Sequence, residues 1–190
     1  MTTNVESIKG EYLRYKGLAD AAIAQVAEPA LCARASDTDN SIATICWHLS
    51  GNLESRFTDF LTSDGEKPWR HREEEFEGRT ATRPELVAKW NRGWEVLLKS
   101  LSELSDVDLQ RSVIIRGQSV QVNEALHRSL GHVAYHVGQI VYLAKSLQGK
   151  QWQYLTIPPG QSDAYNRAPG SEKPAAHAQM LAERIRQSEK

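Results

Sequence analysis

Two histidines one helical turn apart give the clearest chemical signal in the sequence. His132 and His136 are separated by three residues, in a segment whose apolar residues recur at helical spacing. In an α-helix, residues at positions i and i+4 lie on one face, ~40° apart around the axis. Two imidazoles placed in this way can bind one metal ion, as they do in H-E-x-x-H helices. Because a helical histidine is more often a surface or hydrogen-bonded core residue, the pair alone indicates metal binding only weakly.

A third ligand is available on another expected helix. His48 lies near the border of that helix's apolar stripe, just as His132 and His136 lie at the edge of theirs. Three neutral imidazoles and a water molecule form an open site of the kind found in catalytic zinc centres. Imidazole also suits nickel, copper and iron, so the ligands do not select one metal. We expect a single divalent transition metal, zinc or nickel.

Other side chains could support such a site. Gln139 follows His136 by three residues, so it could hydrogen-bond a histidine ring or a metal-bound group, unless it is an ordinary surface residue. Trp47 could frame a pocket. Arg56 and Arg70 could hold an anionic group, although pairing with acidic neighbours at the surface is the favoured interpretation.

The remaining candidates are expected to have ordinary roles. His127 is expected at the surface and His177 in the C-terminal tail, whereas His71 lies in a loop from which it could approach the site. Cys46 falls in an apolar stripe and is expected to be a small core residue. The acidic run 73–75 is expected to be a solvated surface segment.

Four amphipathic segments must position these residues. Apolar residues recur at helical spacing over residues 4–28, 41–62, from Pro84 to about 104, and after Asn123 to about 148. Four such helices predict an all-α four-helix bundle. Two short β-branched runs, at 113–115 and 120–122, predict a small β-hairpin just before the last long helix. Residues 67–80 have no sustained periodicity and are expected to form a long loop, which is often functional.

The chain length suits one bundle domain followed by a short extension. With 190 residues it can bury a good-sized core. We expect residues 1–150 to form the bundle. Residues 151–190 are expected to form an extended Pro- and Gly-containing C-terminal arm, with a short helix at 174–187, that packs on the bundle or on a partner.

Composition argues against several classes of protein. The net charge of −1 offers no electrostatic footprint for nucleic acid. No apolar run approaches the ~20 residues that cross a bilayer, and no signal peptide is apparent. The two cysteines do not form a disulfide framework. We therefore expect a soluble protein of the cytoplasm, with no nucleic-acid or membrane partner.

At the histidines the chain resembles a known superfamily. Residues 132–139, H-V-A-Y-H-V-G-Q, are similar to the H-x-x-x-H-x-G-Q pattern of the DinB-like (DinB/YfiT) superfamily. The resemblance implies a four-helix bundle in which one histidine of the second helix and two of the last long helix bind a metal. His48 matches the first of these positions, and none of the three ligand positions departs from the pattern.

Further segments resemble one uncharacterised branch of that superfamily. They are residues 40–42, 48–53, 55–70 and 155–162, and with the histidine motif they span roughly residues 36–166. The wider superfamily includes thiol-dependent S-transferases that use low-molecular-weight bacterial thiols, and maleylpyruvate isomerases. The resemblance therefore implies a metal-dependent protein and leaves its reaction open.

Three functional hypotheses follow. The first is a metal-dependent enzyme acting on a small molecule, with transfer of a low-molecular-weight thiol to an electrophile favoured over hydrolysis. The second is a non-catalytic protein that binds a metal or small ligand, because the residues between the two helical histidines include no glutamate of the H-E-x-x-H kind. The third is a structural bundle that self-associates. A homodimer is compatible with all three.

Overall fold

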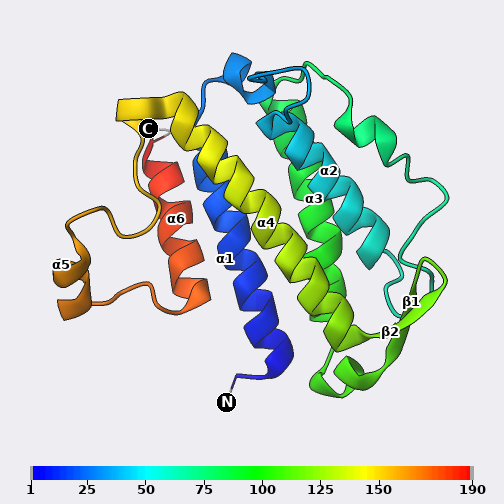
Figure 1. The fold of residues 1–190 in the computed structure, drawn as a ribbon. Helices are drawn as coiled ribbons and strands as arrows, with labels where there is room; N and C mark the ends of the chain where they lie inside the picture. The colour runs from blue at the N-terminus through cyan, green and yellow to red at the C-terminus, as the bar shows by residue number, and fades with distance from the viewer. Residues whose placement is uncertain (1, 189–190) are drawn as a thin grey trace.

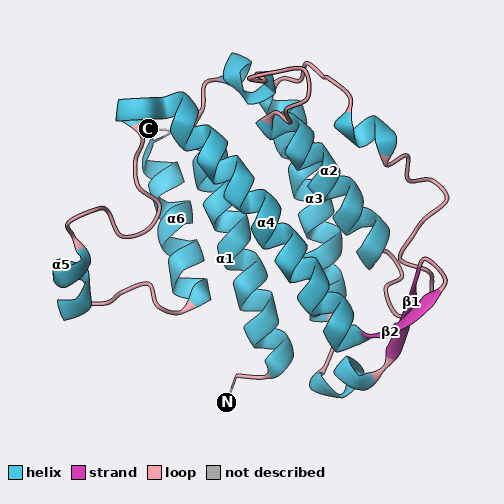
Figure 2. Cartoon of the chain, viewed as in Figure 1, coloured by secondary structure: helices cyan, strands magenta, loops and turns pink. Residues whose placement is uncertain are grey.

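The computed structural model describes residues 2–188, which are mostly helical with one small hairpin (Figure 2). The main elements, in chain order, are α1 (Asn4–Gln25), α2 (Ile42–Phe57), α3 (Arg83–Ser102), β1 (Ser112–Ile115), β2 (Gln118–Gln121), α4 (Val122–Gln148), α5 (Ser162–Arg167) and α6 (Pro174–Ser188). Short 3₁₀ turns occur at Glu28–Cys32, Glu73–Phe76, Asp106–Gln110 and Gly149–Gln151. The expected helical character and the hairpin are confirmed.

The helix boundaries follow from local capping chemistry. Thr3 and Thr82 begin α1 and α3 with capping boxes, and the Ser41 hydroxyl accepts a hydrogen bond from the backbone at the start of α2. The expected end of α2 near residue 62 is wrong, because Thr58 is extended and Asp59 has a positive φ of 49°.

The start of α4 also differs from the expectation. The helix was expected to begin after Asn123, but Asn123 lies inside it. The cap is Gln121, whose backbone N–H donates to the Glu124 carboxylate at 3.0 Å. Since the hairpin leads directly into α4, Val122 belongs to the helix and β2 ends one residue before it.

The long helices pack as two extensive pairs. α2 packs along α3 and α1 packs along α4, while α2 and α4 meet over a smaller area (Figure 1). Between α2 and α3 the backbones approach closely, since a Cβ added at Gly93 would lie 2.6 Å from Ser50 Cα. Trp90 and Trp94 are fully buried in this core, with ring centroids 5.4 Å apart.

The hairpin is anchored to the chain that follows α2. β1 and β2 are antiparallel, with Val113 opposite Val120. At the tip, Arg116 and Gly117 have positive φ of 54° and 70°. Both of their backbone N–H groups donate to the carboxylate of Asp64, at 2.8 and 2.7 Å. This clamp fixes the hairpin tip beside the end of α2.

The C-terminal segment, residues 151–188, contains helical as well as irregular stretches. It contains α5, and α6 packs along α1 on the side away from α2 (Figure 1). Leu181 is fully buried there. His177, expected to be an unremarkable tail residue, is buried and its Nε2 lies 3.0 Å from the Leu155 carbonyl oxygen.

Within the part of the chain that the structure describes, no helix is both long enough and apolar enough to span a membrane.

Candidate metal centre

Three histidines from two helices converge at the junction of α2 and α4. His48 comes from α2, and His132 and His136 come from successive turns of α4. One nitrogen from each ring lies within 4.8 Å of the others, and His48 Nε2 is 3.2 Å from His132 Nε2. Zn–N bonds of ~2.0–2.1 Å place two nitrogens of a tetrahedral site ~3.3 Å apart. The spacing therefore suits a shared ion.

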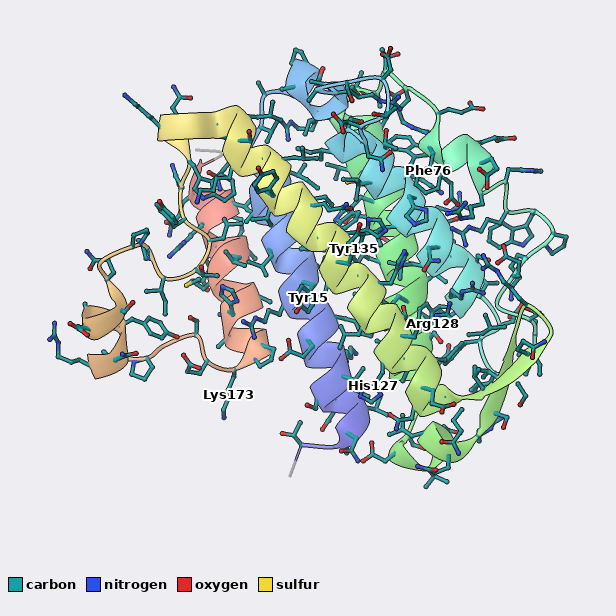
Figure 3. All side chains as sticks on the ribbon, viewed as in Figure 1. Tyr15, Phe76, His127, Arg128, Tyr135 and Lys173 are labelled. Atoms are coloured by element: carbon teal, nitrogen blue, oxygen red, sulfur yellow. The ribbon has the colours of Figure 1, made fainter. Side chains whose placement is uncertain are left out.

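The His48 ring nitrogen that faces away from the other two histidines, Nδ1, contacts a carboxylate. Glu75 Oε2 lies 2.9 Å from His48 Nδ1, and both side chains are about nine-tenths buried or more. An ionised carboxylate only accepts hydrogen bonds, so His48 Nδ1 carries the proton and Nε2 presents its lone pair to the other histidines. Phe76, which is labelled in Figure 3, packs on the His48 ring with centroids 4.6 Å apart and fixes its plane.

Glu75 is itself fixed by an arginine and by a glycine. Arg70 donates to both carboxylate oxygens, from Nε at 2.8 Å and from Nη2 at 2.9 Å. A Cβ at Gly51 would lie only 2.1 Å from Glu75 Oε1, so the carboxylate occupies the space that a larger residue on α2 would fill. Burial acts to raise the pKa of Glu75, but the hydrogen bonds from His48 and Arg70 outweigh it, and the pKa lies below its ordinary value.

His136 has a comparable orienting contact. Its Nδ1 lies 2.7 Å from Gln139 Oε1, and Gln139 Nε2 donates to the Tyr135 hydroxyl at 3.3 Å. With the amide oxygen facing the ring, His136 Nδ1 is the donor and Nε2 is free to bind a cation. Gln139 thus lies on the flank of α4 beside His136.

The site favours neutral imidazoles. Burial, followed by the proximity of His136, His48, Arg70 and Arg56, lowers the pKa of His132 to about 3. Burial is also the main reason why the pKa of His136 is lowered. A metal binds the neutral form of imidazole. Near neutral pH, the rings of His132 and His136 therefore need not lose a proton before a metal binds.

One family comparison bears on this geometry. A family model described as a protein of unknown function, DUF1572, matches residues 1–161. The chain belongs to the DUF1572 family. Searches of curated proteins and of solved structures found no match. The matched residues of this DUF1572 chain include all three histidines, and the family description assigns them no activity.

A cavity of about 210 Å³ lies beside His48 and His132 of the DUF1572 chain and runs along α2 and α4. His48, Asn52 and Arg56 line it at four-residue spacing on α2, and Arg128 and His132 do so on α4. The rings of Phe57 and Phe60 cover another part of the wall. Among the described lining residues there is no aspartate or glutamate, whereas five are arginines: Arg56, Arg70, Arg72, Arg116 and Arg128.

Several sequence expectations are corrected by this arrangement. The acidic run is not uniformly solvated, because Glu75 is 8% exposed and contacts His48. Arg70 is paired with an acidic neighbour as expected, but its side chain is only 2% exposed and does not lie at the surface. No feature of the run itself distinguishes Glu75 from its neighbours in the sequence.

The other candidates lie away from the triad. Trp47 lines a separate cavity that none of the three histidines lines, and it stacks under the Arg79 guanidinium at 4.7 Å. His71 is exposed and lies 4.0 Å from Glu74, and His127 is exposed with Nδ1 2.9 Å from the Asn123 carbonyl oxygen. Cys46 is a fully buried core residue. Arg128 lies one helical turn before His132 in the sequence, but it was not among the predicted site residues.

Proposed function

We propose that this chain is a metal-dependent protein in which His48, His132 and His136 bind one divalent transition metal. The observation that supports the proposal is the convergence of three imidazole nitrogens within 4.8 Å, two of them on rings whose opposite nitrogen is already engaged by Glu75 or Gln139. Such outer partners fix the tautomer and the direction of metal-binding histidines. Zinc and nickel are the proposed ions.

The proposed activity is transfer of a small thiol to an electrophile. Bound at the triad, a divalent metal would supply Lewis acidity that favours the ionised form of a thiol. The protein's own part is orientation and exclusion of water, through the buried Glu75–His48 contact and the Phe76 ring. This activity also draws on the resemblance to the DinB-like superfamily, and a DinB-like four-helix bundle is part of the proposal.

Hydrolysis is the weaker alternative, because a base to activate water is not at hand. Both oxygens of Glu75 are occupied, by Arg70 and by His48. Within residues 2–188, the cavity beside His48 and His132 is lined by no carboxylate. A thiol ionises more easily than water and needs less help from a base. A non-catalytic metal-binding role, a homodimer and a cytoplasmic setting stay predictions.

Metal analysis tests the proposal directly. Protein purified without an affinity tag is expected to contain about one equivalent of zinc or nickel by mass spectrometry, before or after reconstitution. The His132→Ala/His136→Ala double variant should contain none. His127→Ala is the matched control, since His127 lies on the same helix but is exposed and bonded only to the backbone.

Two results would overturn the metal assignment: no metal in the reconstituted wild-type protein, or equal metal in the double variant. The proposed reaction is tested separately, by following loss of a chromogenic electrophile in the presence of small thiols. Turnover that needs both thiol and metal is expected. A metal-loaded protein that shows no turnover would favour the non-catalytic hypothesis.

A further inference from the structure

The cavity beside the histidines carries an excess of positive charge. Its five arginines face three carboxylates: Glu66 pairs with Arg116 at 2.9 Å and with Arg56 at 3.5 Å, Glu75 pairs with Arg70, and Glu73 pairs with Arg72. Within the described residues, no carboxylate lies within ion-pair distance of Arg128, which stands exposed on the flank of α4 toward α2 and the hairpin (Figure 3). A bound metal dication would increase this excess.

Two buried guanidinium nitrogens around the cavity have no acceptor. Among the residues that the structure describes, neither Arg56 Nη1 nor Arg70 Nη1 makes a hydrogen bond, although each nitrogen is fully buried. A buried donor left without a partner destabilises the protein, and more so when it is charged. Neighbouring charges also act on Arg56. Burial is the main cause that lowers the pKa of Arg56. The charges of Arg116, Arg70 and Arg128 lower it further, and Glu66 opposes them.

The helical spacing orders the cavity along its length. Arg128 precedes His132 by one turn, ~6 Å along α4, and Arg56 follows His48 by two turns, ~12 Å along α2. Arg56 and Arg128 therefore form one end of the cavity, the arginine end, and the histidines lie at the other, with Arg70 beside Glu75 near His48. A volume of about 210 Å³ admits a molecule of only a few heavy atoms.

We propose that the arginine end of this cavity binds the oxyanion group of a small ligand whose other end faces the histidines. The group is a carboxylate or a phosphate, which the planar guanidinium fork recognises through paired N–H donors. For the end of the ligand that binds the metal, the inference rests on the proposed function. The excess charge and the unpaired guanidinium nitrogens support the anionic end independently.

Calorimetry with matched probes tests the proposal at low ionic strength. On zinc-loaded protein, 3-mercaptopropionate and 3-mercapto-1-propanol present the same thiol and differ in the carboxylate. The carboxylate probe is expected to bind about tenfold more tightly. Arg128→Gln should remove most of this difference and leave the affinity for the neutral thiol unchanged. Arg186→Gln, an exposed arginine on α6 outside the cavity, is the matched control and should behave as the wild type.

Metal-free protein separates the two proposals. Succinate and inorganic phosphate titrated into it identify which oxyanion is preferred, and Arg128→Gln should weaken that binding whether or not the protein ever takes up metal. If the wild type binds no metal but these anions bind through Arg128, the metal assignment fails and the anion site stands. Equal affinity for the two thiols on zinc-loaded protein would overturn the anion site. So would an equal effect of Arg128→Gln and Arg186→Gln.

Discussion

Replacing Gly51 by alanine should break the chain of contacts that orients His48. In a helix interior, Gly→Ala normally stabilises by up to ~1 kcal/mol. At this position the new Cβ would lie 2.1 Å from Glu75 Oε1 and 2.8 Å from its Cδ, so the carboxylate must move. Its hydrogen bonds with His48 and Arg70 cannot both survive that movement.

The expected cost follows from those lost contacts. Hydrogen bonds to charged groups contribute ~1.5–3 kcal/mol each, and a buried ion pair that is broken costs ~3–5 kcal/mol. Part is recovered because a glutamate side chain is flexible and because alanine favours the helix. We expect Gly51→Ala to lower the free energy of unfolding by ~1–3 kcal/mol, or the melting temperature by roughly 2–12 °C. Metal affinity should fall by about 10- to 100-fold, as for other lost partners of ligating histidines.

Gly138→Ala is the matched control for this variant. Gly138 is exposed on α4, two residues from His136, and no heavy atom would lie within 4 Å of its added Cβ. It should gain up to ~1 kcal/mol with unchanged metal affinity. Chemical denaturation and metal titration with a competing chelator measure both quantities. If Gly51→Ala and Gly138→Ala have the same stability and the same metal affinity, the reasoning is refuted. If Gly51→Ala is less stable but keeps full metal affinity, Glu75 supports the fold but does not orient the ring of His48.

Two further substitutions test the scaffold around the site. Gly93→Ala places a Cβ 2.6 Å from the Ser50 backbone, which cannot move aside. We therefore expect the free energy of unfolding, measured by denaturant titration, to fall by ~1–3 kcal/mol. An unchanged denaturation midpoint would contradict the close approach of α2 and α3. Asp64→Asn should lower the melting temperature at neutral pH, because backbone N–H groups of Glu66, Gly117 and Arg116 hold the pKa of Asp64 below its ordinary value. A depressed carboxyl pKa contributes stability above the ordinary aspartate pKa of 3.8, and that stability is lost as the pH falls through the folded value. The difference between wild type and variant should therefore shrink in acid, and a difference that persists there would argue against the carboxylate clamp.

Regular spacing made much of the site predictable from the sequence. His132 and His136 one turn apart, and Gln139 three residues later, define one flank of α4, and the structure brings that flank together with His48. The same rule would have found Arg128, since it stands one turn before His132 on the same face.

The loop contributions could not be predicted in the same way. Glu75 and Arg70 come from the irregular segment between α2 and α3, where no periodicity relates a residue to a face. Their position depends on the space left by Gly51 on α2, and a glycine inside a helix does not reveal what fills that space. Gly138, the glycine of the histidine motif, has only open space beside it.

The location of the triad gives a bound metal a structural effect as well as a chemical one. His48 belongs to the α2/α3 pair, whereas His132 and His136 belong to the α1/α4 pair, and these two pairs meet less extensively than the helices within each pair do. A metal held by all three rings would therefore join the pairs where their own packing is sparse. Because it would bind the assembled site and not the separated helices, metal binding and the packing of α2 on α4 must stabilise each other. Any substitution that loosens this junction should then weaken metal binding even when it touches none of the ligands.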